Sequence, residues 1–182
     1  DEISYLRGVA WTTIQLVANK IYPRNIYPDV AVVNIGNKNY KLFFYHKNDP
    51  RPPDQIVRSR EWQQLKKILA EFKDISEQNA IKPIIMYIPS MAHIYAQYST
   101  EQSGENWLKI RWQQVAAKAN MEHAMIHVSD ELHIPLTSLT PVFEAAAREG
   151  KLLYYPFDTH WNSTGREIAS TFMASILKKE MK

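Results

Sequence analysis

The chain has 182 residues, with 22 lysines and arginines against 19 acidic residues and no cysteine. The lack of cysteine excludes disulfides, thiolate metal sites and a cysteine nucleophile. The basic excess is small and scattered, which argues against a nucleic-acid partner, and no apolar run reaches the roughly 18–20 residues of a membrane span. The apolar fraction of 45% is ordinary for a globular protein, and we expect one domain over residues 1–182.

The first predicted element is a helix over residues 3–21. Its apolar residues recur at spacings of three and four, which places them on one stripe: Ile3, Leu6, Ala10, Ile14, Val17 and Ile21. Pro23 and Pro28 end this helix.

A β-hairpin is predicted next. Two strand-like runs, 31–35 and 40–45, are separated by the four-residue stretch Gly-Asn-Lys-Asn at 36–39. Residues 46–57 contain three prolines and few apolar side chains. We therefore expect them to form a connecting loop.

A helix is predicted over 60–78, with an inward face made by Trp62, Leu65, Leu69, Phe72 and Ile75. A continuous apolar run at 84–88 then favours a buried parallel strand.

The next stretch predicts a short helix at 91–98, a longer helix at 105–120 and a second strand at 124–128. The larger aromatic side chains stand at core spacing, namely Trp62, Phe72, Trp107 and Trp112. This spacing favours packing over a nucleic-acid stacking platform.

The end of the chain predicts two more helices. Thr140-Pro141 is typical of a helix start, with Thr at the N-cap, and that helix should end near Gly150. A brief extended piece at 152–155 precedes the final helix at 163–180, for which Ser163 or Thr164 is the expected N-cap.

The alternation of helix and strand after residue 60 indicates an α/β fold. Besides the hairpin, only two convincing sheet strands follow, which is few for a complete doubly wound sheet. We therefore expect residues 58–182 to form an incomplete three-layer α/β/α core, and residues 1–57 to add a helix and a β-hairpin insertion.

Asp158 and His160 are the leading candidates for chemistry. An imidazole exchanges a proton near neutral pH, and a carboxylate on one ring nitrogen fixes its tautomer and stabilises the imidazolium. A spacing of two brings the side chains together if the intervening turn points both the same way. The alternative from the residues alone is an Asp that satisfies backbone N–H groups beside a surface His.

The sequence segments around this pair and earlier in the chain favour the catalytic interpretation. LYYPFDTHWNSTGREIAS, LTSLTPVFEAAAREGKLLYY and KPIIMYIPSMAHIYAQY together resemble the SGNH (GDSL-like) hydrolase and acetyltransferase superfamily, in the branch with a C-terminal Asp-x-His-Trp block (alginate O-acetyltransferase-like). This resemblance covers about residues 60–182 and implies a flavodoxin-like three-layer fold. It also implies an esterase or O-acyltransferase that acts on an acylated carbohydrate or small ester outside the cytoplasm, with no cofactor.

The resemblance implies roles for named residues. His160 would be the general base and Asp158 its orienting acid, while Trp161, Asn162 and Ser90 are candidates for substrate binding. A serine would attack the ester carbonyl and form an acyl-enzyme.

This sequence departs from the family where the nucleophile should be. It contains no Gly-Asp-Ser block and no Gly-x-Asn-Asp block, and Met91 stands where the branch often has Lys. Ser90 follows a predicted strand but lacks the glycines of a nucleophile elbow, so a helix cap is its expected role. We therefore expect the chain to be the C-terminal part of such an enzyme, with its serine elsewhere.

Two alternatives stay open. The chain is either the part of an esterase that carries the His and Asp, or a non-catalytic binding module on the same scaffold. A metal site is disfavoured, because His123 and His127 lack the His-Glu-x-x-His pattern.

Overall fold

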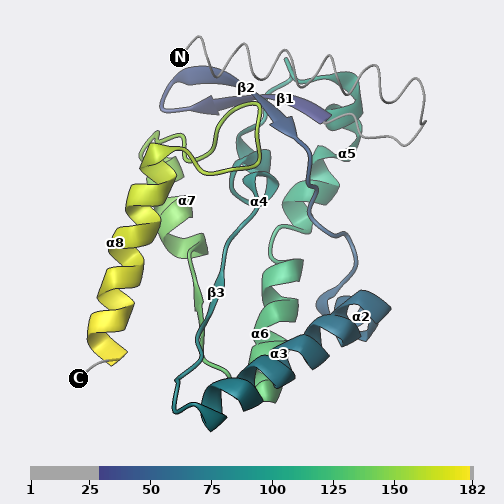
Figure 1. The fold of residues 1–182 in the computed structure, drawn as a ribbon. Helices are drawn as coiled ribbons and strands as arrows, with labels where there is room; N and C mark the ends of the chain where they lie inside the picture. Colours follow the sequence, from purple (N-terminus) through teal and green to yellow (C-terminus); the bar gives the residue numbers. More distant parts are fainter. Residues whose placement is uncertain (1–28, 181–182) are drawn as a thin grey trace, which may run out of the picture.

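The computed structural model describes residues 29–180 (Figure 1), so the helix predicted over 3–21 lies outside the described residues. The elements in chain order are β1 (Asp29–Ile35), β2 (Lys38–Phe44), α2 (Pro53–Arg58), α3 (Arg60–Gln78), β3 (Ile85–Tyr87), α4 (Met91–Tyr95), the 3-10 helix η1 (Ala96–Tyr98), α5 (Glu105–Ala116), α6 (Asn120–Leu132), β4 (Leu136–Ser138), α7 (Thr140–Arg148) and α8 (Ser163–Glu180). The order of helices and strands is that of a mixed α/β protein with an added hairpin.

Strands β1 and β2 form the predicted hairpin, but its turn is shorter than the expected four-residue loop. The strands pair antiparallel up to Ile35 opposite Lys38. Gly36 and Asn37 alone make the turn, with φ angles of 56° and 62°. Two successive positive φ values are the requirement of a type I′ turn, whose twist matches the flanking strands.

The second sheet is a parallel pair. Ile85 of β3 lies opposite Leu136 of β4, and both strands have three residues. In Figure 1, β3 runs between α7 and α8 on one side and α6 on the other. The sequence correctly predicted an α/β arrangement with few strands.

The strand predicted at 124–128 is wrong, because these residues lie inside α6. Ala124 and Val128 are both buried one helical turn apart, which buries one helix face and not a strand. The actual second strand is β4, which the sequence analysis missed. The expected loop at 46–57 also ends early, since α2 begins at Pro53, where proline is well suited to the first helical turn.

The predicted inward face of α3 holds only in part. Trp62 is buried and packs with Ile56 of α2 and Val128 of α6. Further along, Phe72 and Ile75 are 46% and 54% exposed. The prediction that the large aromatic side chains pack in the core also holds only in part. Trp107 is fully buried and stacks on Phe44 at 4.3 Å between ring centroids, while Trp112 is 72% exposed.

The main core lies between the hairpin, α4, α7 and the segment that follows α7. Tyr95 of α4 is buried here, and its hydroxyl donates to the Lys151 carbonyl and accepts from the Leu153 N–H, both at 2.9 Å. At the hairpin tip, a Cβ added to Gly36 would lie 2.9 Å from the Cα of Gly150. Because only glycines allow backbones to approach this closely, the hairpin tip and the end of α7 are in direct contact.

Candidate active site

Asp158 and His160 are in direct contact. The Nδ1 atom of His160 lies 2.5 Å from Oδ1 of Asp158, and the same oxygen accepts the His160 backbone N–H at 3.1 Å. The intervening turn therefore points both side chains the same way. A carboxylate so placed holds the proton on Nδ1, which leaves Nε2 as the acceptor nitrogen.

The backbone of residues 155–160, here called the dyad loop, closes on itself. The Tyr155 N–H donates to the His160 carbonyl at 3.0 Å, and the Asp158 N–H donates to the Tyr155 carbonyl at 3.2 Å. Tyr154 and Trp161 form an antiparallel bridge at the base of the loop. These bonds fix the loop conformation that brings Asp158 to His160.

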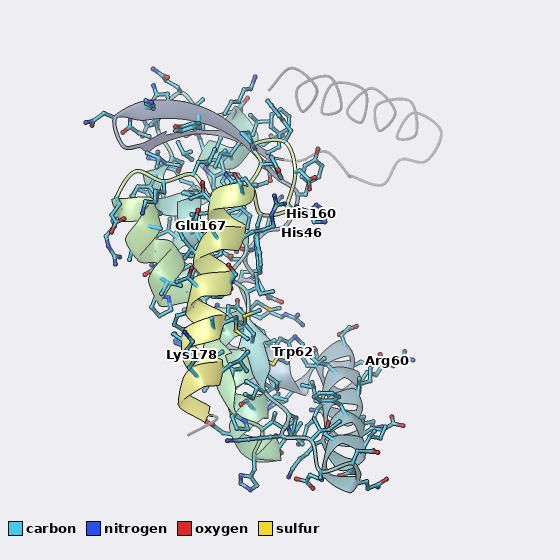
Figure 2. All side chains as sticks on the ribbon, turned by 60° about the vertical axis from the view of Figure 1, so that its left-hand side comes forward. His46, Arg60, Trp62, His160, Glu167 and Lys178 are labelled. Atoms are coloured by element: carbon cyan, nitrogen blue, oxygen red, sulfur yellow. The ribbon has the colours of Figure 1, made fainter. Side chains whose placement is uncertain are left out.

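The dyad is open to solvent. The side chains of His160 and Asp158 are 81% and 51% exposed, and Figure 2 shows His160 at the end of the molecule where the hairpin lies. Among residues 29–180, Nε2 of His160 has no hydrogen-bond partner. An oriented imidazole with a free acceptor nitrogen can take a proton from a hydroxyl group brought to it.

Asn162 anchors the dyad loop on the side of α8. Its Oδ1 accepts the Gly165 N–H at 3.0 Å, and its Nδ2 donates to the Leu152 carbonyl at 2.7 Å. Asn162 therefore caps α8, and the prediction that Ser163 or Thr164 caps this helix is wrong. Both ends of the Asn162 amide are engaged within the protein, although its sequence position first pointed to substrate binding.

Trp161 packs against the body of the molecule. Its ring meets Phe143 of α7 edge to face, at 5.8 Å between centroids, and Phe143 meets Tyr154 in the same way at 6.0 Å. The Tyr154 hydroxyl donates to the Pro89 carbonyl at 2.6 Å, and burial raises its pKa. Because such aromatic pairs are stabilising, the contact with Phe143 holds Trp161, the residue that follows His160, in place.

The hairpin anchors the other side of the dyad loop. The Phe43 N–H donates to the Pro156 carbonyl at 2.9 Å, and the Phe43 ring meets Phe157 at 5.1 Å. The pKa of Tyr45 is raised by burial and, to a smaller extent, by the charge of Asp158. These contacts were not predicted from the sequence, although the alternation along 40–45 places Phe43 and Tyr45 on one face of the strand.

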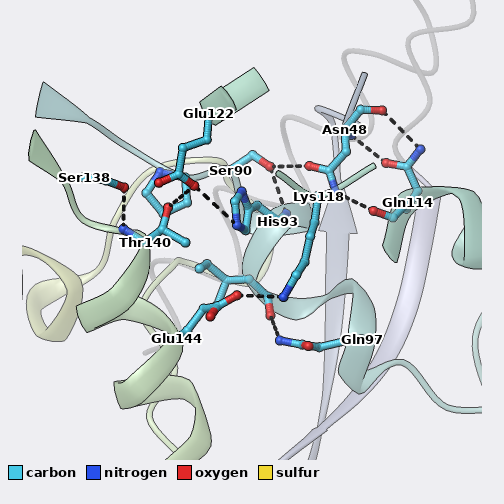
Figure 3. Close-up of polar contacts among 12 residues, drawn as sticks. Asn48, Ser90, His93, Gln97, Gln114, Lys118, Glu122, Ser138, Thr140 and Glu144 are labelled. Atoms are coloured by element: carbon cyan, nitrogen blue, oxygen red, sulfur yellow. Dashed lines mark hydrogen bonds and ion pairs between the residues drawn. The ribbon is translucent and has the colours of Figure 1, made fainter. Parts of the chain in front are cut away.

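Ser90 lies in a different polar network. Its Oγ accepts the His93 N–H at 3.0 Å and donates to Oδ1 of Asn48 at 3.1 Å, and it caps α4 as predicted. Asn48 in turn bonds to Gln114 through both its backbone and its side chain (Figure 3). Within residues 29–180, the hydrogen bonds of Ser90 serve α4 and this buried network, and none is with the dyad.

His93 is the buried titratable group of this network. It is 2% exposed, its Nε2 lies 3.9 Å from Oε2 of Glu122, and its Nδ1 has no hydrogen-bond partner within residues 29–180. Burial lowers the pKa of His93, while the charges of Glu122 and Glu144 oppose this effect. Thr140 donates to the same Glu122 carboxylate at 2.9 Å, so the network links α4, α6 and α7.

Within the described residues, no group of three or more His, Cys, Asp or Glu side chains is placed to hold a metal ion. In the same part of the chain, none of the helices combines the length and apolar character needed to cross a bilayer.

A comparison with known protein families identifies a family that matches the chain. The model of the SGNH hydrolase-like domain of the acetyltransferase AlgX matches residues 42–182, which include the dyad, α8 and the last three residues of β2. Comparison with curated proteins gave no match. Comparison with solved structures gave none either.

Proposed function

Because the chain belongs to the family of SGNH hydrolase-like domains represented by the acetyltransferase AlgX, we propose that it supplies the base and the orienting acid of an acyl-transfer site. The observation that carries this proposal is the contact of 2.5 Å between His160 Nδ1 and Asp158 Oδ1 on a solvent-facing loop. In a Ser-His-Asp triad the same contact fixes the tautomer and leaves Nε2 to face the serine.

In the proposed reaction, Nε2 of His160 takes the proton of a serine hydroxyl as its oxygen attacks an ester carbonyl. The imidazolium is stabilised by the Asp158 carboxylate and returns its proton to the leaving alcohol when the tetrahedral intermediate collapses. An acyl-serine remains. His160 then deprotonates water or a sugar hydroxyl, which takes the acyl group and frees the serine.

We assign the nucleophile to a segment outside residues 1–182. The chain contains no Gly-Asp-Ser block, and Ser90 is engaged with Asn48 and His93. The substrate class that fits an acyl transfer of this family is an acylated carbohydrate or a related small ester, and we place its site of action outside the cytoplasm.

A non-catalytic binding module is the second candidate. The observation that favours it is the same lack of a nucleophile block within the 182 residues. In that case the dyad loop would only be part of the scaffold.

A fluorophosphonate probe separates the two candidates, because it labels a serine only when a base activates the hydroxyl. In the full-length protein we expect labelling of one serine, and His160→Ala should slow it at least about a hundredfold. His127→Ala is the matched control, since His127 is also an exposed histidine beside a carboxylate, Glu131 at 4.0 Å. Unchanged labelling in His160→Ala would refute the assignment, and no labelling of the wild type would favour the binding module.

A further inference from the structure

Phe43 lies on the outer face of β2, opposite the core. Its neighbours Leu42 and Phe44 are buried at 0% and 1% exposure, and side chains alternate between the two faces of a strand. Phe43 therefore points away from the main core, and yet it is only partly exposed. The ring of Phe157 covers it, at 5.1 Å between centroids.

A backbone hydrogen bond reinforces this aromatic contact. The Phe43 N–H, at the open edge of β2, donates to the Pro156 carbonyl at 2.9 Å. An open strand edge presents unpaired N–H groups, and here the dyad loop takes one of them. Two adjacent residues of the loop are thus held by one residue of the strand.

These contacts lie directly before Asp158. On the other side of His160, Trp161 and Asn162 fasten the chain to α7 and α8. On the near side, Phe157 precedes Asp158 in the chain, and its docking on Phe43 fixes the backbone from which the carboxylate projects. Because the side chains of His160 and Asp158 are 81% and 51% exposed, their own packing contributes little, and the geometry of the dyad depends chiefly on these two anchors.

We propose that the end of β2, through Phe43, is a positioning element that holds Asp158 against Nδ1 of His160. Strand β2, which the sequence predicted to belong to an insertion, would then contribute to the geometry of the site. The contact with Phe157 stands without any assumption about chemistry, but its catalytic consequence rests on the proposed function of the dyad.

The first test measures the dyad directly in the 182-residue chain. In ¹⁵N-histidine NMR spectra, recorded at a pH where the imidazole is neutral, His160 should show a protonated Nδ1 that exchanges slowly with water. Phe43→Ala should accelerate that exchange at least about tenfold, whereas Phe43→Tyr, which keeps the ring, should retain the wild-type rate. Phe72→Ala is the matched control, because Phe72 is a partly exposed phenylalanine on α3.

A wild-type exchange rate in Phe43→Ala would overturn the proposal. If Phe43→Ala does not fold, Phe157→Ala removes the same contact from the loop side. In that variant the Phe43 amide should lose its protection against hydrogen exchange, and retained protection would likewise overturn the proposal.

The second test measures esterase activity in the full-length protein. Phe43→Ala should lower kcat at least about tenfold with little change in KM, and Phe43→Tyr should restore it. If His160→Ala abolishes activity while Phe43→Ala leaves kcat unchanged, the positioning role fails and the proposed function stands. If His160→Ala is fully active, the proposed function fails, and the NMR measurement still decides whether β2 positions the dyad.

Discussion

Replacement of Asn162 by alanine should destabilise the protein through two separate hydrogen bonds. Its Oδ1 accepts the Gly165 N–H at 3.0 Å, and loss of such an N-cap costs about 1 kcal/mol. Its Nδ2 donates to the Leu152 carbonyl at 2.7 Å, and loss of such a bond costs about 1 kcal/mol more. The free energy of unfolding should therefore fall by about 2 kcal/mol, which for a chain of this size lowers the Tm by about 4–8 °C.

Two further variants test how this loss of stability is shared between the two hydrogen bonds. Asn162→Ser keeps an oxygen for the cap but loses the bond to Leu152, so it should lose about 1 kcal/mol. Ser163→Ala is the control, because Ser163 is exposed and Asn162 occupies the cap; its change should stay within about 0.5 kcal/mol.

Urea unfolding followed by far-ultraviolet circular dichroism measures all three free energies. A loss in Ser163→Ala as large as that in Asn162→Ala would refute the cap assignment. A wild-type value for Asn162→Ala would show that neither hydrogen bond contributes to stability.

Two other substitutions test the packing around the site. Gly165→Ala should destabilise the protein by about 1–3 kcal/mol in the same urea experiment, because an added Cβ would overlap the Leu153 carbonyl oxygen; the usual gain of alanine over glycine within a helix would contradict this. His93 has its pKa lowered, chiefly by burial, so the unfolded state binds its proton more readily and wild-type stability should decline as pH falls below about 6.5. In His93→Leu this decline should be shallower by up to about 1.4 kcal/mol per pH unit, and an unchanged slope in thermal unfolding between pH 5 and pH 7 would refute the effect.

The fold was predictable where a segment was long and regular. The 19-residue helix α3 and the final helix α8 were both predicted within a residue or two of their observed ends. The short run at 124–128 was not, because a short run that is apolar except for His127 suits a buried strand and a buried helix equally well. Its helical nature depends on the continuation to Leu132 and on His133, which ends α6 in a left-handed conformation with φ of 52°.

Within the candidate site, only the contact of the central pair was predictable. Asp158 and His160 are two residues apart, so a single tight turn decides whether their side chains meet. The sequence segments around them also resemble a known family. The contacts of Phe43 with Pro156 and Phe157 join residues more than a hundred positions apart. Nothing local in either segment indicates such a pairing, since it arises from where the hairpin docks.

The backbone contact between Gly36 and Gly150 limits the number of residues before the dyad. The chain touches the hairpin at its tip through Gly150 and again near its other end, where Pro156 accepts the Phe43 N–H. Six residues at full extension span about 20 Å, and β2 from Lys38 to Phe43 is five residue steps long, about 16–17 Å. Since these two lengths differ by about one residue step, the connection has little slack, and deletion of two residues would break one of the two contacts. The hairpin therefore sets a lower limit to the number of residues that separate α7 from the dyad.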